Sequence, residues 1–81
     1  MKIKPNRYYK ECYKDNVVEY FIIYVDEKYV YLIACKYKDD PLYKYNTKHK
    51  WGTIEAWLNR SNKYRYSIEN ITKEDIFLEL L

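Results

Sequence analysis

Glycine is nearly absent from this sequence: Gly52 is the only one in 81 residues. Proteins contain about 7% glycine on average, and it is the residue that adopts a positive φ angle without strain. Phosphate-binding loops of the GxGxxG and GxxxxGK types need several glycines close together. Both loop types are therefore excluded, and few positions of this chain can form a strain-free left-handed turn.

Histidine and cysteine are scarce as well, which removes most catalytic and metal-binding arrangements. His49 lies between two lysines, and Cys12 and Cys35 are far apart with no CxxC or HxxxH spacing. A catalytic set needs a nucleophile, a base and a group that orients them. We expect a protein that is not an enzyme, with no cofactor, no metal and no disulfide, and with two reduced thiols on opposite faces of a sheet.

Long apolar runs are missing too. Uncharged stretches such as YFIIYV at 20–25 are far shorter than the roughly 20 residues of a membrane span. The N-terminal residues MKIKPNRYYK lack the apolar region of a secretory signal. We expect no contact with a membrane and a cytoplasmic location.

Aromatic residues, by contrast, are abundant: twelve tyrosines bring the aromatic share to 20%, within a hydrophobic share of 48%. Disordered chains lack such residues, and 81 residues suffice for one domain, so we expect a single folded domain over 1–81. Lys, Ile, Asn and Tyr are favoured over Gly, Ala, Pro and Arg, as AT-rich codons would produce. Some of the tyrosines would therefore reflect codon usage, at positions where other proteins have Phe or Leu.

Three consecutive strands are expected in the first half of the chain. Runs rich in Tyr, Val and Ile, separated by polar turns at 14–16 and 26–28, are typical of antiparallel strands. The expected strands are Arg7–Tyr13, Val17–Val25 and Tyr29–Tyr37.

The second and third strands can be aligned by side-chain type. When Val25 faces Val30, one face of the hairpin is aliphatic, and Phe21 lies opposite Ala34. The aliphatic face then carries Phe21, Ile23, Val25, Val30, Leu32 and Ala34. The opposite face collects tyrosines, and whether a helix covers it stays open. The tyrosines expected to share it are Tyr9, Tyr13, Tyr20, Tyr24, Tyr31 and Tyr37.

A loop, a helix and a further strand are expected next. Residues 38–50 contain Asp-Pro and no apolar periodicity, which indicates a long loop. Thr53 is a suitable N-cap, and Ile54 and Trp57 share one face of the helix that follows. Asn62–Ile68 alternates apolar with polar residues, as a strand does.

The chain ends in a second expected helix. Thr72 and Asp75 form a capping box, and an apolar stripe follows at Ile76, Phe77, Leu80 and Leu81. The order β-β-β-α-β-α is that of a small α+β domain with a mainly antiparallel four-stranded sheet. We expect both helices to pack on the aliphatic face. An SH3-like barrel that begins with the three-stranded meander is the alternative.

The net charge of +3 is concentrated in residues 36–51, where five lysines stand against two aspartates. Lysines contact phosphates and aromatic rings stack on unpaired bases, so this segment has the composition of a nucleic-acid surface. Its candidate contacts with nucleic acid or an acidic protein are Lys36, Lys38, Tyr43, Lys44, Tyr45, Lys48, Lys50 and Trp51.

Two binding hypotheses follow. The first is a small inhibitor of the anti-CRISPR type, an accessory protein from a phage or mobile element that occludes a protein or ribonucleoprotein partner. Its anchors would be the exposed tyrosines Tyr9, Tyr20, Tyr24, Tyr31 and Tyr37, rimmed by the basic loop. The alternative is a module that binds single-stranded DNA or RNA through residues 36–51.

A third hypothesis comes from a resemblance to small ribonuclease toxins of the RelE type. The chain is similar to them in its size and basic charge, and the resemblance implies chemistry by Lys, Arg and Tyr side chains. The chain departs from the family in having three arginines and no pair of helices ahead of the expected sheet.

Overall fold

The computed structural model describes residues 3–13 and 16–81, and these form five strands and two helices. The strands are β1 (Arg7–Tyr13), β2 (Asn16–Val25), β3 (Tyr29–Lys36), β4 (Tyr43–Thr53) and β5 (Tyr66–Ile71). Helix α1 (Ile54–Lys63) connects β4 to β5, and α2 (Lys73–Leu80) ends the chain. The expected α+β class is confirmed.

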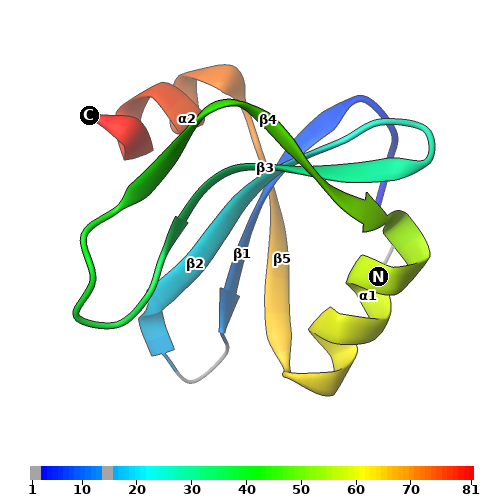
Figure 1. Cartoon of the computed structure of the whole chain (residues 1–81), viewed down its shortest axis with the longest axis horizontal. Helices are drawn as coiled ribbons and strands as arrows, with labels where there is room; N and C mark the ends of the chain where they lie inside the picture. The colour runs from blue at the N-terminus through cyan, green and yellow to red at the C-terminus, as the bar shows by residue number, and fades with distance from the viewer. Residues whose placement is uncertain (1–2, 14–15) are drawn as a thin grey trace.

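All strands belong to one antiparallel sheet in the order β4-β3-β2-β1-β5 (Figure 1). Strands β4 and β5 form the two edges, and the described residues show no pairing between them. The turn expected at 14–16 falls largely outside the described residues.

The prediction of four strands was wrong because the expected loop at 38–50 is mostly strand β4. Only a short connection at 37–42 remains, with Asp39 in the left-handed region at φ 66°. Tyr, Thr and Trp are strong strand formers, and in β4 they alternate with lysine rather than with aliphatic residues. The following strand also begins later than expected, at Tyr66, because α1 extends to Lys63.

The hairpin of β2 and β3 has the expected register near its turn, where Val25 lies opposite Val30. A bulge beyond Ile23 then shifts the pairing, so that Phe21 faces Cys35 instead of Ala34. As a result Cys35 joins the core on the aliphatic face. Ala34 pairs with Ile22 on the other face, and both side chains are fully buried.

Helix α1 closes the aliphatic face. Trp57 is fully buried there and meets the Phe21 ring edge-on, with ring centroids 5.8 Å apart. The buried core comprises Tyr9, Phe21, Ile23, Val25, Val30, Leu32, Cys35 and Trp57.

A buried carboxylate fastens α1 to β1. Glu11 has no exposed surface, and it accepts hydrogen bonds from Trp57 Nε1 at 2.6 Å, Ser61 Oγ at 2.5 Å and Arg60 Nη1 at 2.6 Å. A buried charge is tolerated only when it is paired and hydrogen-bonded, and Glu11 meets both conditions.

Helix α2 lies on the opposite face, so the expectation that both helices cover the aliphatic face was wrong. Its Glu79 pairs with Lys10, the neighbour of Glu11 on β1, which points to the other side of the sheet. Lys44 of β4 donates to the carbonyl of Leu80. The two helices therefore sit at opposite corners of the sheet (Figure 1).

Candidate interaction surface

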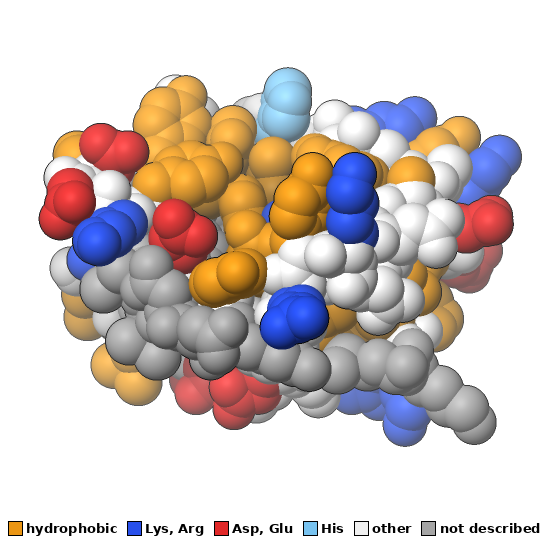
Figure 2. All heavy atoms as spheres, turned by 90° about the horizontal axis from the view of Figure 1, so that it is seen from below, with side chains coloured by type: hydrophobic (Ala, Val, Ile, Leu, Met, Phe, Trp, Pro, Cys, Tyr) orange, Lys and Arg blue, Asp and Glu red, His pale blue; other side chains and the backbone are white. Residues whose placement is uncertain are grey.

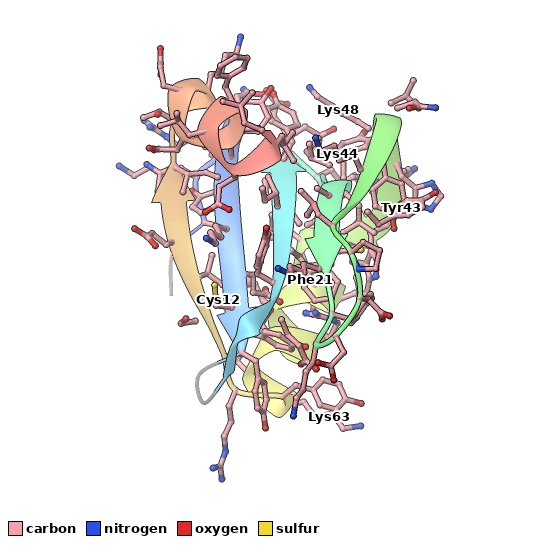
Figure 3. The ribbon with its side chains drawn as sticks, turned by 90° about the vertical axis from the view of Figure 1, so that its left-hand side faces the viewer. Cys12, Phe21, Tyr43, Lys44, Lys48 and Lys63 are labelled. Atoms are coloured by element: carbon pink, nitrogen blue, oxygen red, sulfur yellow. The ribbon has the colours of Figure 1, made fainter. Side chains whose placement is uncertain are left out.

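Strand β4 contains most of the basic aromatic segment, and strand geometry separates its lysines from its aromatic residues. Successive side chains of a strand point to opposite faces of the sheet. Lys44 and Lys48 project from one side of β4 and Tyr43 from the other (Figure 3). The expected mixture of lysines and aromatics on a single surface is thus divided between two faces.

The lysines of β4 lie over tyrosines of the neighbouring strands. Lys48 Nζ is 3.7 Å from the ring centroid of Tyr24 and 5.8 Å from that of Tyr8. Lys50 Nζ is 3.5 Å from the ring centroid of Tyr29. An ammonium within about 6 Å of an aromatic centroid is attracted by the ring quadrupole. The surface that these contacts create, the lysine–tyrosine face, comprises Tyr8, Tyr24, Tyr29, Tyr31, Lys48 and Lys50.

Hydroxyl contacts fix the tyrosine rings of this face. The Tyr24 hydroxyl donates to Asn6 Oδ1 at 3.1 Å, and the Tyr31 hydroxyl donates to Asp26 Oδ2 at 2.9 Å. The centroid of Tyr24 lies 4.9 Å from that of Tyr8 and 6.4 Å from that of Tyr31. The rings therefore form a row whose orientation is set before any partner arrives.

Asp26 fixes the end of this row at the turn between β2 and β3. Its Oδ1 accepts hydrogen bonds from the backbone nitrogens of Tyr29 at 2.6 Å and Lys28 at 2.7 Å. These two bonds hold the pKa of the Asp26 carboxyl below its ordinary value. The hydrogen bond to Asp26 in turn raises the pKa of Tyr31, so the phenol keeps its proton and continues to donate.

Two other lysines on the same side of the sheet, Lys10 and Lys44, bind helix α2. Lys10 pairs with Glu79 and also lies 4.7 Å from the ring centroid of Tyr20. Lys44 is engaged by the end of α2. Within the part of the chain that the structure describes, neither Lys48 nor Lys50 forms an ion pair. Their positive charges are therefore available to a partner.

The opposite side of β4 continues the aromatic core outward. Tyr43 and Tyr45 have ring centroids 4.7 Å apart, and His49 stacks on Tyr45 at 5.4 Å. Trp51 meets Trp57 edge-on at 4.9 Å. Figure 2 shows hydrophobic side chains gathered beside the single histidine. A cavity of about 400 Å³ opens there and is lined by Cys35, Tyr37, Asp40, Pro41, Tyr43 and Tyr45.

Among the predicted anchors, Tyr20, Tyr24 and Tyr31 lie on the expected side of the sheet, but Tyr9 and Tyr37 do not. Tyr9 is only 5% exposed and belongs to the core, because β1 pairs with β2 so that Tyr9 faces Ile23. Tyr37 leaves the end of β3 on the core side and meets Phe21 edge-on.

Tyr13, which was also expected on the tyrosine side, packs edge-on against Tyr66 at 5.5 Å. Phe21 meets the same Tyr66 ring at 5.9 Å, which places this contact at the core. Tyr13 is therefore a third tyrosine that the expected set placed on the wrong side.

Tyr8 and Tyr29 were missed by the sequence analysis. Tyr8 lies opposite Tyr24 once the register of β1 is known, so an alignment of β1 with β2 would have found it. The remaining predicted lysines lie near the end of β3. Lys36 lies opposite Tyr20 in the pairing of β3 with β2, and Lys38 is exposed in the connection to β4.

The two cysteines lie on opposite faces of the sheet, as expected. Cys12 pairs with Tyr20 on the side of α2, and burial raises the pKa of its thiol. Cys35 is buried in the core, and both thiols are free. Across residues 3–13 and 16–81, no three His, Cys, Asp or Glu residues lie together in a way that would hold a metal ion.

Comparisons of the chain with protein-family models, with curated proteins and with solved structures give no match. Neither helix in the described ranges has the length and apolar character that crossing a membrane requires. The geometry of the lysine–tyrosine face is therefore the basis for a functional interpretation.

Proposed function

We propose that this chain is a small non-enzymatic binding protein that occludes an acidic surface of a protein or ribonucleoprotein partner. The seating of Lys48 over Tyr24 and of Lys50 over Tyr29 supports this proposal most directly. The rings offer a large contact area at low entropy cost, and the ammonium groups add charge that is already in position. Carboxylates on a partner would pair with the ammonium groups while the surrounding partner surface contacted the tyrosine rings.

A protein partner fits this face better than single-stranded nucleic acid does. Stacking requires an uncovered ring face, but lysine ammonium groups lie over the rings of Tyr24 and Tyr29. The exposed aromatics of β4, Tyr43 and Trp51, are on the opposite face of the strand from Lys48. Phosphate contacts and base stacking would therefore fall on different surfaces, so we place the nucleic-acid hypothesis second.

Occlusion of a partner is the mode of action of small inhibitor proteins. The residue usage, which is typical of AT-rich codons, supports the narrower hypothesis of a phage or mobile-element inhibitor of host defence. The basic charge directs that hypothesis toward acidic partners, because an acidic mimic of DNA would carry the opposite sign.

The test compares two double variants that change the net charge equally. Lys48→Ala with Lys50→Ala removes the charges of the lysine–tyrosine face, while Lys38→Ala with Lys63→Ala removes two lysines elsewhere. In Figure 3 Lys63 lies at the end of the molecule away from Lys44 and Lys48. Each chain is immobilised and used to capture partners from cells of the native host, with and without nuclease, and the captured material is identified by mass spectrometry and RNA sequencing.

We expect the wild type and the control to recover the same proteins after nuclease treatment, and the Lys48/Lys50 variant to recover about tenfold less. Recovery of those proteins by all three chains would refute the role of this face. Material that consists of RNA and disappears with nuclease would replace the proposal with the nucleic-acid hypothesis.

A further inference from the structure

Strand β4 has a neighbour on one side only within the described part of the chain, because it is the terminal strand of the order β4-β3-β2-β1-β5. It is 11 residues long, contains no proline, and most of its residues are exposed. An edge strand presents a row of backbone donors and acceptors with which another strand can pair. β4 is thus an accessible template for an added strand, with two register shifts in its pairing to β3.

The two sides of β4 would meet an added strand with different chemistry. Lys48 and Lys50 lie on the side of the tyrosines, whereas Tyr43 and Trp51 lie on the side of the core, as Figure 3 shows for Lys48 and Tyr43. Side chains of paired strands stand beside each other on each face of the sheet. A strand added at this edge would therefore match β4 if it alternated acidic and apolar residues.

A second copy of the chain does not satisfy this requirement. Antiparallel pairing of β4 with itself would place lysines of one copy beside lysines of the other, on the same face, and like charges opposite one another are destabilising. Lysines at an exposed edge are a known means of preventing self-association. The same lysines attract a strand of opposite charge, so the edge discriminates between partners by charge.

The aromatic side of β4 also offers a place for an apolar side chain. The cavity of about 400 Å³ beside Tyr43 and Tyr45 opens at the first residues of β4. An apolar residue of the added strand would stand next to Tyr43 and reach this cavity. Charge on one side and apolar contact on the other would together fix the register of the added strand.

We propose that β4 binds an extended segment of another protein, in which acidic residues alternate with apolar ones, by adding it as a sixth strand to the sheet. This inference rests on the proposed function, since it names the chemistry by which the acidic partner is recognised. Backbone pairing would supply affinity, and the alternation of side chains would supply specificity.

The experiment uses the intact chain and three labelled peptides matched to the length of β4. The first alternates Glu with Val, the second has the same composition in blocks, and the third is the alternating peptide methylated at every inner backbone nitrogen. Binding is followed by fluorescence anisotropy, and hydrogen exchange of the β4 amides is followed by NMR. The blocked peptide keeps the net charge, and the methylated peptide keeps the charge pattern but loses its donors.

We expect the alternating peptide to bind at least about tenfold more tightly than the other two and to slow the exchange of amides within 43–53. Equal binding of all three peptides, or binding that leaves β4 amide exchange unchanged, would overturn the strand-addition proposal. The lysine–tyrosine face would still account for partner capture in that case, because the Lys48/Lys50 variants test that face independently.

Discussion

The two helices of this chain have similar lengths and both begin at a threonine N-cap, but they are held to the sheet in very different ways. Helix α1 buries Trp57 completely and Ser61 almost completely. None of the residues of α2, all of which are described, is buried. Its Phe77 and Leu78 are 65% and 67% exposed. A capping signal therefore predicts where a helix begins, but not how much it contributes to the core.

The difference originates in what each helix finds on its face of the sheet. α1 meets the aliphatic face and a buried carboxylate, Glu11, which receives donors from Trp57, Arg60 and Ser61. The Arg60 guanidinium also lies 4.3 Å from the Trp57 ring centroid. α2 lies on the other face, which carries the buried Ile22 and Ala34 as well as lysines and tyrosines, and it is attached through Lys10 and Lys44. α1 is thus part of the core, whereas α2 is attached at the surface.

The largest contrast is expected between one aromatic residue of each helix. Trp57→Ala removes a fully buried side chain and leaves a cavity, so it should lower the free energy of unfolding by about 3–5 kcal/mol. Phe77→Ala changes an exposed position and should alter it by at most about 0.5 kcal/mol. Chemical denaturation followed by fluorescence and circular dichroism measures both values. Similar losses for the two variants would show that α2 belongs to the core.

Removal of α2 as a whole should have a smaller effect than Trp57→Ala. The sequence suggests that truncation after Thr72 deletes much of the core, but only Ile76 and Leu80 of the expected apolar stripe are even half-buried. Half-burial of two aliphatic side chains stabilises by about 2 kcal/mol in total.

We therefore expect the truncated chain to unfold cooperatively at a lower denaturant concentration. Lys10→Ala is the matched control, since it loosens the attachment of α2 and keeps the helix itself. A truncated chain without a cooperative transition would contradict the structure and restore the interpretation drawn from the sequence.

The contrast between the helices also shows which features the sequence could reveal. Signals carried by neighbouring residues were read correctly: the caps at Thr53 and Thr72, and the pairing of Val25 with Val30 beside the turn at Asp26. Features decided by tertiary packing were not foreseen. Of the apolar stripe on α2, Ile76 and Leu80 are half-buried, but the stripe does not indicate which face of the sheet receives the helix.

The candidate site shows the same division between local and tertiary information. Strand β4 was read as a loop because its alternation is of lysine with aromatic residues, a pattern that looks polar throughout. Tyr9 was assigned to the wrong face because the register of β1 depends on β2. The bulge beyond Ile23 exchanged the faces of Ala34 and Cys35. Glu11 was not singled out from the sequence, since its donors come from a helix much later in the chain.

The smallest expected effect concerns the N-caps of the helices, which respond differently to acid. The Asp75 carboxylate accepts hydrogen bonds from the Thr72 backbone nitrogen and hydroxyl, both at 2.9 Å, and these bonds lower its pKa. A lowered pKa stabilises the fold above the unfolded value of about 3.9, and this contribution is lost as the pH falls through the folded pKa.

The N-cap of α1 is the hydroxyl of Thr53, which does not titrate. Below the folded pKa of Asp75, NMR amide signals at the start of α2 should therefore move toward random-coil positions while those at the start of α1, next to Thr53, stay in place. The variant Asp75→Asn should remove this transition, because its side chain keeps an acceptor but has no acidic proton. The titration of Asp26 is distinguished by its location at the turn between β2 and β3. Parallel movement of both helices would show that acid acts on the whole fold and not on the attachment of α2.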